Sequence, residues 1–145
     1  MWKLRELPPL IKTFTWRLIR RALATGDRAG RYTPRIDKHC STCGLVENDA
    51  HLFFHCDFAR AVWFSTQPPL RTDSLPQEDD GVQLTDTIDN SLMQKILITM
   101  WYLWKARNDK RFANKNCTAW QLHHAVAAYI TTINSDTGVP CWNRW

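Results

Sequence analysis

Long apolar runs are missing from this sequence of 145 residues. A helix that crosses a bilayer needs about eighteen or more consecutive apolar residues, and no stretch of the chain provides them. A secretory signal is also missing, and Pro8 and Pro9, with no serine near them, argue against a mitochondrial presequence. We therefore expect no membrane partner.

Cysteine is present in an odd number, five, so the thiols cannot all be paired within the chain. Three of the five lie between Cys40 and Cys56, in the stretch C-S-T-C-G-L-V-E-N-D-A-H-L-F-F-H-C. No predicted strand precedes Cys40, which argues against the redox C-x-x-C of a thioredoxin-like unit. A Cys–His nucleophilic site needs one activated thiolate rather than a C-x-x-C pair.

This stretch instead predicts a zinc site, because a tetrahedral Zn²⁺ ion takes four thiolate or imidazole donors. The predicted ligands are Cys40, Cys43, His51 and Cys56. His55 remains an alternative ligand, and His39 is interpreted as a neighbour of the site. Buried cysteines that pack as small apolar side chains are the structural alternative. Thiolate ligands require reduced sulfur, so we expect an intracellular protein, in the nucleus or the cytoplasm.

The spacing of the ligands also predicts their backbone. Gly44, directly after the first pair, can take the positive φ on which a tight turn ends. His51 and Cys56 are five residues apart, so one regular helix cannot present both to one ion. We expect a helical turn from about Asp49, a break near Cys56 and a second helix from Asp57.

The net charge of +5 is distributed unevenly, with +7 over residues 1–39 and −5 over residues 66–90. Basic flanks favour a polyanionic partner, so RNA or DNA is the predicted ligand. The candidate contact residues are Arg17, Arg20, Arg21, Arg28, Arg31, Arg35 and Lys38. The alternative for this basic face is a solvated surface, and Trp16 is expected in the core rather than as a stacking surface.

Helical periodicity predicts a mainly α-helical fold with an irregular metal loop. A first helix should begin at Pro8–Pro9, and its apolar stripe is Leu10, Ile11, Phe14, Leu18 and Ala22. Ala24 to Asp27 should end this helix and could cap a short second one. After the metal loop, the predicted core positions are Phe58, Ala61, Val62, Trp63 and Phe64.

The chain is expected to be divided by a proline-rich acidic segment. The predicted units are a zinc-binding domain at 1–65, a flexible linker at 66–90, a helical connector at 91–133 and a tail at 134–145. Thr118 and Gln121 form a capping-box pattern before the last helix. The adjacent His123 and His124 are interpreted as surface residues.

Several motifs together resemble a known family: P-P-x-I-K-T-F-x-W-R-L, A-L-x-T-x-D, C-x-x-C-G and H-L-F-F-H-C-x-F-A-R-A-V-W. This series is similar to the zinc-binding domain that follows the reverse transcriptase in plant LINE-type (non-LTR) retrotransposons. Many members of that family carry proline where this chain has Asp57. The resemblance covers about residues 2–64.

The later motif W-x-x-W-K-A-R-N-D-K-x-F, at residues 101–112, resembles the segment that joins this domain to a ribonuclease H domain. The resemblance implies a non-catalytic module of a polyprotein, with reverse transcriptase and ribonuclease H domains as partners. Their catalytic carboxylate motifs are not found here, so we expect a fragment of a larger protein. A zinc-stabilised protein-interaction module and a non-functional retroelement fragment remain as alternatives.

Overall fold

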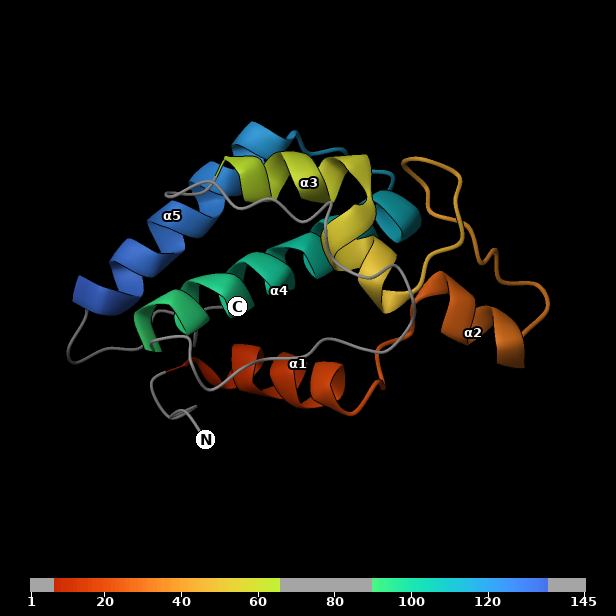
Figure 1. Cartoon of the computed structure of the whole chain (residues 1–145), viewed down its shortest axis with the longest axis horizontal. Coiled ribbons are helices and arrows are strands. Elements are labelled where there is room, and N and C mark those ends of the chain that lie inside the picture. The colour runs from red at the N-terminus through yellow and green to blue at the C-terminus, as the bar shows by residue number, and fades with distance from the viewer. Residues whose placement is uncertain (1–6, 66–89, 136–145) are drawn as a thin grey trace.

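The computed structural model describes residues 7–65 and 90–135 of the chain (Figure 1). The elements are α1 (Pro9–Ile19), α2 (Gly26–Tyr32), η2 (His51–His55), α3 (Asp57–Phe64), α4 (Asn90–Ala113) and α5 (Ala119–Ser135). The described residues contain no strand, and the mainly α-helical prediction is confirmed. The expected linker, apart from its last residue, and the expected tail beyond residue 135 lie outside the described residues.

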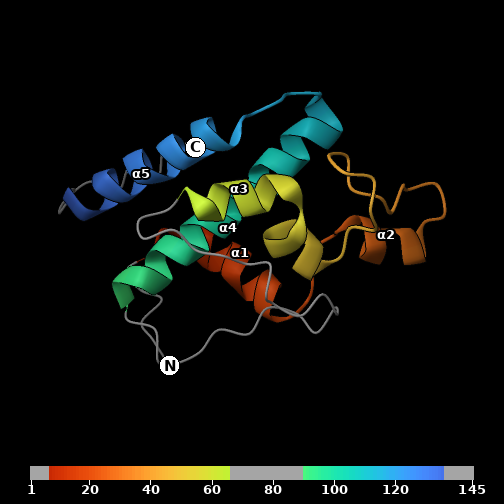
Figure 2. The same ribbon diagram turned by 45° about the horizontal axis from the view of Figure 1, so that its top comes forward.

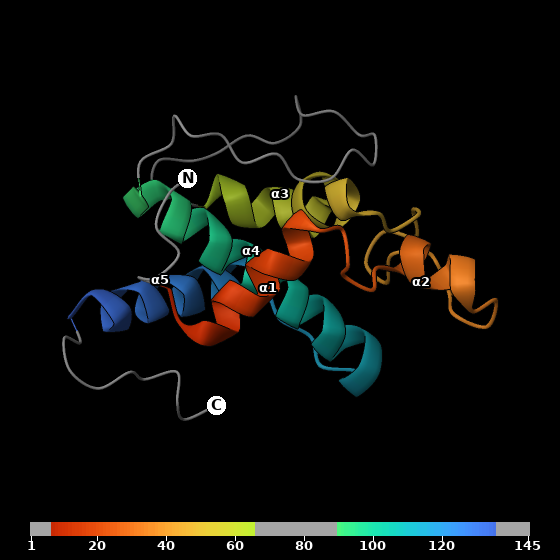
Figure 3. The ribbon, with the colours of Figure 1, turned by 90° about the horizontal axis from the view of Figure 1, so that it is seen from below.

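Helix α4 runs through the middle of the molecule (Figure 1). It contacts α1 on one side and α5 on the other, and it also touches η2, while α3 packs against α5 and η2. Figure 2 shows α5 and α3 above α4, and Figure 3 shows α1 lying across α4 from the opposite side. Helix α2 lies at one end of the molecule. The central helix α4 belongs to the second half of the chain, and it packs against α1 and η2 from the first half and against α5 from the second.

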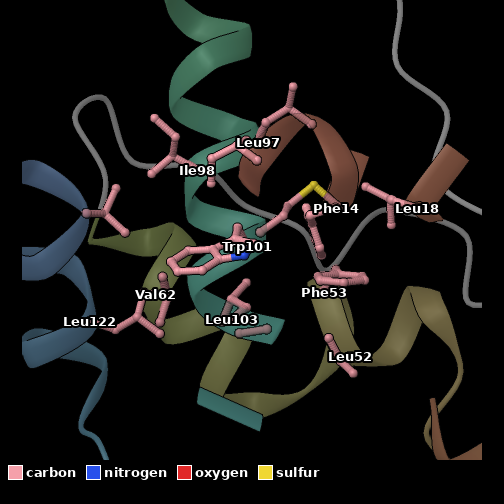
Figure 4. Close-up of a cluster of buried hydrophobic side chains, with 14 of the residues drawn as sticks. Phe14, Leu18, Leu52, Phe53, Val62, Leu97, Ile98, Trp101, Leu103 and Leu122 are labelled. Atoms are coloured by element: carbon pink, nitrogen blue, oxygen red, sulfur yellow. The ribbon is translucent and has the colours of Figure 1, made fainter. Parts of the chain in front are cut away.

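One hydrophobic core joins these elements (Figure 4). Phe14 of α1 packs edge to face on Phe53 of η2, with ring centroids 6.0 Å apart. The Trp63 indole N–H donates a hydrogen bond of 2.6 Å to the Phe53 carbonyl, which satisfies the polar atom of a buried ring. Leu97 and Ile98 of α4 are fully buried in the same cluster. Burial of α4 therefore depends on side chains supplied by residues 7–65.

Helix α1 begins as predicted, with Pro9 in its first turn. It ends earlier than its apolar stripe suggests, because Arg21 takes a left-handed φ of 55°. The amides of Arg21 and Ala22 then donate to the carbonyls of Leu18 and Arg17, which is the Schellman pattern of a helix end. The assignment of Ala22 to the buried stripe was wrong, since it lies beyond this end and is exposed.

The buried side of α1 is narrower than predicted. Ile11, Phe14 and Leu18 are buried, but Leu10 is 38% exposed. Trp16 is 61% exposed, so its placement in the core was wrong. Trp16 lies two positions after Phe14, which is about 200° around a helix of 3.6 residues per turn and therefore on the opposite side.

Helices α2 and α5 have capped beginnings. The Thr25 hydroxyl accepts from the Arg28 amide, which confirms the expected cap of α2. Thr118 and Gln121 exchange two hydrogen bonds of 3.0 and 3.1 Å before α5, and this confirms the capping box. Along α5, Leu122, Val126 and Tyr129 are buried, and Ala125 and Ile130 are partly buried. No helix among the described residues is long and apolar enough to span a bilayer.

Helix α3 buries fewer residues than predicted. Val62 and Trp63 are buried and Phe58 is half-buried, but Ala61 is exposed and Phe64 is 62% exposed. Ala59, which the prediction omitted, is buried at 1% exposure. The buried residues Ala59, Val62 and Trp63 are spaced i, i+3 and i+4 and share one side of α3, whereas Phe64 lies about 200° around the helix from Val62.

Candidate metal centre

The first pair of donors lies on a tight turn. The Gly44 amide donates to the Cys40 carbonyl at 2.9 Å, and Gly44 takes a φ of 80°, as the sequence predicted. The Thr42 amide points at the Cys40 sulfur at 3.4 Å. A bridge between His39 and Val46 closes the base of the turn. These backbone bonds aim both sulfur atoms of the C-x-x-C pair toward the same side.

The second pair of donors lies on a bent helical segment. The Asn48 carboxamide accepts from the His51 amide at 2.7 Å, which caps the turn that carries His51. The Cys56 amide then donates to the His51 carbonyl, five residues back, at 2.8 Å. Cys56 itself is extended, with a ψ of 142°, and α3 begins at Asp57. The expected turn, break and second helix are all present.

Folding brings the four predicted ligands together. One donor atom from each of Cys40, Cys43, His51 and Cys56 lies within 4.8 Å of all the others. The Cys40 and Cys56 sulfurs are 3.8 Å apart, and the Cys43 sulfur is 3.0 Å from Nε2 of His51. A zinc tetrahedron with bonds of about 2.3 Å has edges of about 3.8 Å. The donor set and its spacing therefore fit Zn²⁺.

The thiols of this cluster influence one another. The hydrogen bond from Cys56 lowers the pKa of Cys40 to about 3. The same hydrogen bond, together with burial, raises the pKa of Cys56, and burial raises the pKa of Cys43. A metal ion that binds here must displace protons from the two thiols whose pKa is raised, so its affinity decreases as the pH falls.

The remaining histidines lie outside this donor group. Nδ1 of His39 is 2.8 Å from a carboxylate oxygen of Asp37, and His39 is exposed. His55, the alternative ligand, is half-buried at the end of η2. His123 and His124 lie on α5, half-buried and exposed respectively. The choice of Cys56 with His51 over His55 stays a prediction, which the geometry favours.

A buried carboxylate that sequence reasoning missed lies between the two donor pairs. Glu47 is 1% exposed and accepts from the Gly26 amide at 2.7 Å. Both of its oxygens also accept from the Arg107 guanidinium of α4, at 2.7 to 3.2 Å, and Arg111 adds a contact at 3.2 Å. Arg111 also donates to the Asp37 carbonyl. We call the group Glu47, Arg107 and Arg111 the Glu47 clamp, which fastens the metal loop to α4.

Helix α2 approaches the metal loop so closely that only glycine fits at position 26. A Cβ atom there would lie 2.9 Å from the Lys38 carbonyl, a separation too short for real contacts.

The cavity beside the donors, about 90 Å³, is lined by Cys40 and Cys56 from the loop and by Leu103 from α4. Helix α4 therefore forms one wall of the region around the metal cluster.

A second acidic residue of the loop is also paired internally. Asp49 is 1% exposed, and its two oxygens accept from the Arg28 guanidinium at 3.0 and 3.1 Å. Arg28 further donates to the Leu23 carbonyl at 2.6 Å. Arg28 was predicted to contact nucleic acid, but the structure shows its guanidinium engaged in this pair. The pair of Arg28 and Asp49 holds α2 against the metal loop.

The other predicted basic residues lie on the surface. Arg17, Arg20 and Arg21 are exposed at the end of α1, and Arg35 and Lys38 are exposed on the approach to Cys40. Arg31 is exposed too, and it pairs with Asp27 at 2.6 Å on α2. These residues do not converge on one pocket. They lie along the segment that runs from α1 through α2 to the metal turn (Figure 1).

Three cysteines and one histidine within reach of a single ion, with all four supplied by one short segment, define a zinc-binding domain. Residues 1–63 match the family model described as zinc-binding in reverse transcriptase, so the match and the cluster agree on the class. This family is an accessory zinc-binding domain rather than a catalytic one. Comparison with curated proteins and with solved structures returned no match.

Proposed function

We propose that the chain is a non-catalytic zinc module from the polyprotein of a plant LINE-type (non-LTR) retrotransposon, and that it binds RNA or DNA beside a reverse transcriptase. The family match supports the association with a reverse transcriptase. The four protein donors supply a complete tetrahedral set for Zn²⁺, and such a closed site is structural because it leaves no position for a reactive water. The need for reduced thiolates favours a location inside the cell, in the nucleus or the cytoplasm.

The zinc ion would stabilise folding rather than carry out chemistry. Bound zinc contributes roughly 10–16 kcal/mol to folding in small zinc-binding peptides. In this chain, Cys40 and Cys43 anchor the turn that follows the basic segment, while His51 and Cys56 anchor the start of α3. Metal binding would therefore fix the basic segment that precedes Cys40 relative to the helical core.

The observation that carries the nucleic-acid proposal is the positive charge exposed along α1 and at its end. From Pro9 to Ala22 the chain contains four basic residues and no acidic residue, and Arg17, Arg20 and Arg21 are exposed. Lysine and arginine on such a face neutralise phosphates and release counterions. The buried acids of the loop do not cancel this field at close range, because Glu47 and Asp49 are themselves neutralised by arginines.

Docking on the neighbouring domains of the polyprotein is the second candidate function. It is favoured by apolar side chains exposed around α2 and the metal turn: Tyr32 (84%), Leu45 (62%) and Val46 (45%). Exposed apolar side chains contribute to protein contact sites where they form a continuous patch. The two candidates use different surfaces, so they can be tested separately.

A salt titration tests the nucleic-acid proposal. We expect the zinc-loaded chain to bind a fluorescent single-stranded RNA or DNA oligonucleotide with an affinity that falls linearly in log–log coordinates as salt rises. The double variant Arg17→Gln/Arg21→Gln should reduce the slope by about 0.7 for each phosphate that is no longer neutralised. Arg60→Gln is the matched control, because Arg60 is exposed on α3 and pairs with Asp57. Absence of binding at low salt would overturn the proposal.

A further inference from the structure

The outer side of α1 carries a large aromatic side chain that the core does not use. Trp16 is 61% exposed, and Ile19 beside it is 52% exposed. The opposite side of the same helix packs in the core, where Ile11, Phe14 and Leu18 are buried. An indole that remains in water on a well-packed helix has no role in the hydrophobic core.

This indole is held by a neighbouring cation. The Arg20 guanidinium carbon lies 4.8 Å from the centroid of the Trp16 ring, one helical turn further on. A cation over an indole face is attracted by the ring quadrupole, with about 0.5–1 kcal/mol at exposed sites. The contact restricts the rotamers of both side chains, so a flat aromatic surface and a positive charge are presented together.

We propose that Trp16 and Arg20 form a stacking platform for an unpaired base, which makes single-stranded RNA or DNA the ligand of the α1 surface. This inference rests on the proposed function and specifies its ligand. A base in a duplex is already stacked on both faces, whereas an unpaired base can leave its strand and lie on an aromatic side chain. Arg17, one residue after Trp16, is exposed and offers a cation to a phosphate of the same strand.

Charge complementarity selects a nucleic acid over a protein as the occupant. The residues of α1 include no acid, and the helix is followed directly by Arg20 and Arg21. An apolar protein partner would gain nothing from this concentration of cations, while a nucleic acid offers both a π face and a phosphate at each nucleotide. Stacking on an aromatic side chain contributes about 1–3 kcal/mol per base and tolerates any base.

Fluorescence anisotropy with a short single-stranded oligonucleotide and its duplex tests the platform. Trp16→Ala should weaken single-strand binding by about 5- to 150-fold, which is the stacking contribution converted at 1.4 kcal/mol per factor of ten. The salt slope should stay unchanged, because no phosphate contact is removed. Trp16→Phe should restore most of the affinity, and duplex binding should change less than about twofold in either variant.

Trp120→Ala is the matched control, because Trp120 is similarly exposed, at 67%, but lies on α5 against His124. It should leave single-strand binding unchanged, and all variants should retain the wild-type melting temperature. If Trp16→Ala binds single strands as the wild type does while Arg17→Gln/Arg21→Gln lowers the slope, the platform is wrong and the proposed function stands. If the wild type binds no oligonucleotide at low salt, both fail.

Discussion

At the scale of single residues, each pair of metal donors depends on a different local device. Gly44 provides the positive φ on which the C-x-x-C turn ends, and Asn48 caps the turn that carries His51. The extended backbone at Cys56 is essential to the second pair, because it turns this thiol toward His51, which a continuous helix would not do. Asp57, directly after this break, is an acidic first-turn residue of α3.

The ligand set can be tested by replacing zinc with Co²⁺ and recording the visible and near-ultraviolet spectrum. Cys56→Ser should reduce the thiolate charge-transfer band and lower the metal affinity by more than the roughly 10- to 100-fold loss that follows removal of a second-shell partner. His55→Ala should leave the spectrum unchanged. Cys117→Ser is the control for thiol loss, since Cys117 is exposed and outside the donor group. The reverse pattern, with loss in His55→Ala only, would replace the fourth ligand.

At the scale of elements, the metal loop is fastened on two sides by its own acidic residues. Asp49 holds α2 through Arg28, and Glu47 holds α4 through Arg107 and Arg111. Arg107 also lies over the Trp104 ring, with 4.9 Å to its centroid, which fixes the guanidinium on the α4 side. The position of the metal loop is therefore determined by helices that carry no metal ligand.

Glu47→Gln is expected to lower the free energy of unfolding of the zinc-loaded protein by about 3–5 kcal/mol, as urea denaturation would measure. The reason is that Arg107 and Arg111, only 11% and 12% exposed, would lose the charge that compensates them. Asp109→Asn is the control on the same helix. Its pair with Lys105 is exposed and should contribute no more than about 1 kcal/mol. Equal effects of the two substitutions would contradict the role of the Glu47 clamp.

At the scale of the whole molecule, the family match ends at residue 63, but the core does not. Met93, Leu97 and Met100 of α4 are fully buried in the cluster that also contains Phe14 and Phe53. Residues of the expected connector thus share one core with residues of the expected zinc-binding domain. The zinc module of this chain is larger than the part that its metal motif identifies.

A fragment of residues 1–65 should therefore behave differently from the chain of residues 1–135. We expect the fragment to lose a cooperative thermal transition and to bind zinc at least about tenfold more weakly, because metal affinity includes the free energy of folding. Circular dichroism and competition with a chromophoric chelator would measure the two quantities. A fragment with the cooperativity and zinc affinity of the longer chain would show that α4 and α5 are dispensable.

The sequence by itself determined the local features of this protein. The spacing of Cys40, Cys43, His51 and Cys56 predicted the donor group, the turn at Gly44 and the helix break. The capping box at Thr118 predicted the start of the last helix. These features depend on backbone preferences and ligand chemistry within a few residues, so they can be recognised without the fold.

Only the tertiary structure decided which residues outside the motif matter. Glu47 and Arg107 are 60 residues apart, and nothing local in either segment shows that they meet. Trp16 was expected in the core, yet packing of α1 on α4 uses the opposite side of the helix. Long-range charge pairing and the orientation of a packed helix depend on the complete fold, which also determined the basic residues that remain available to a ligand.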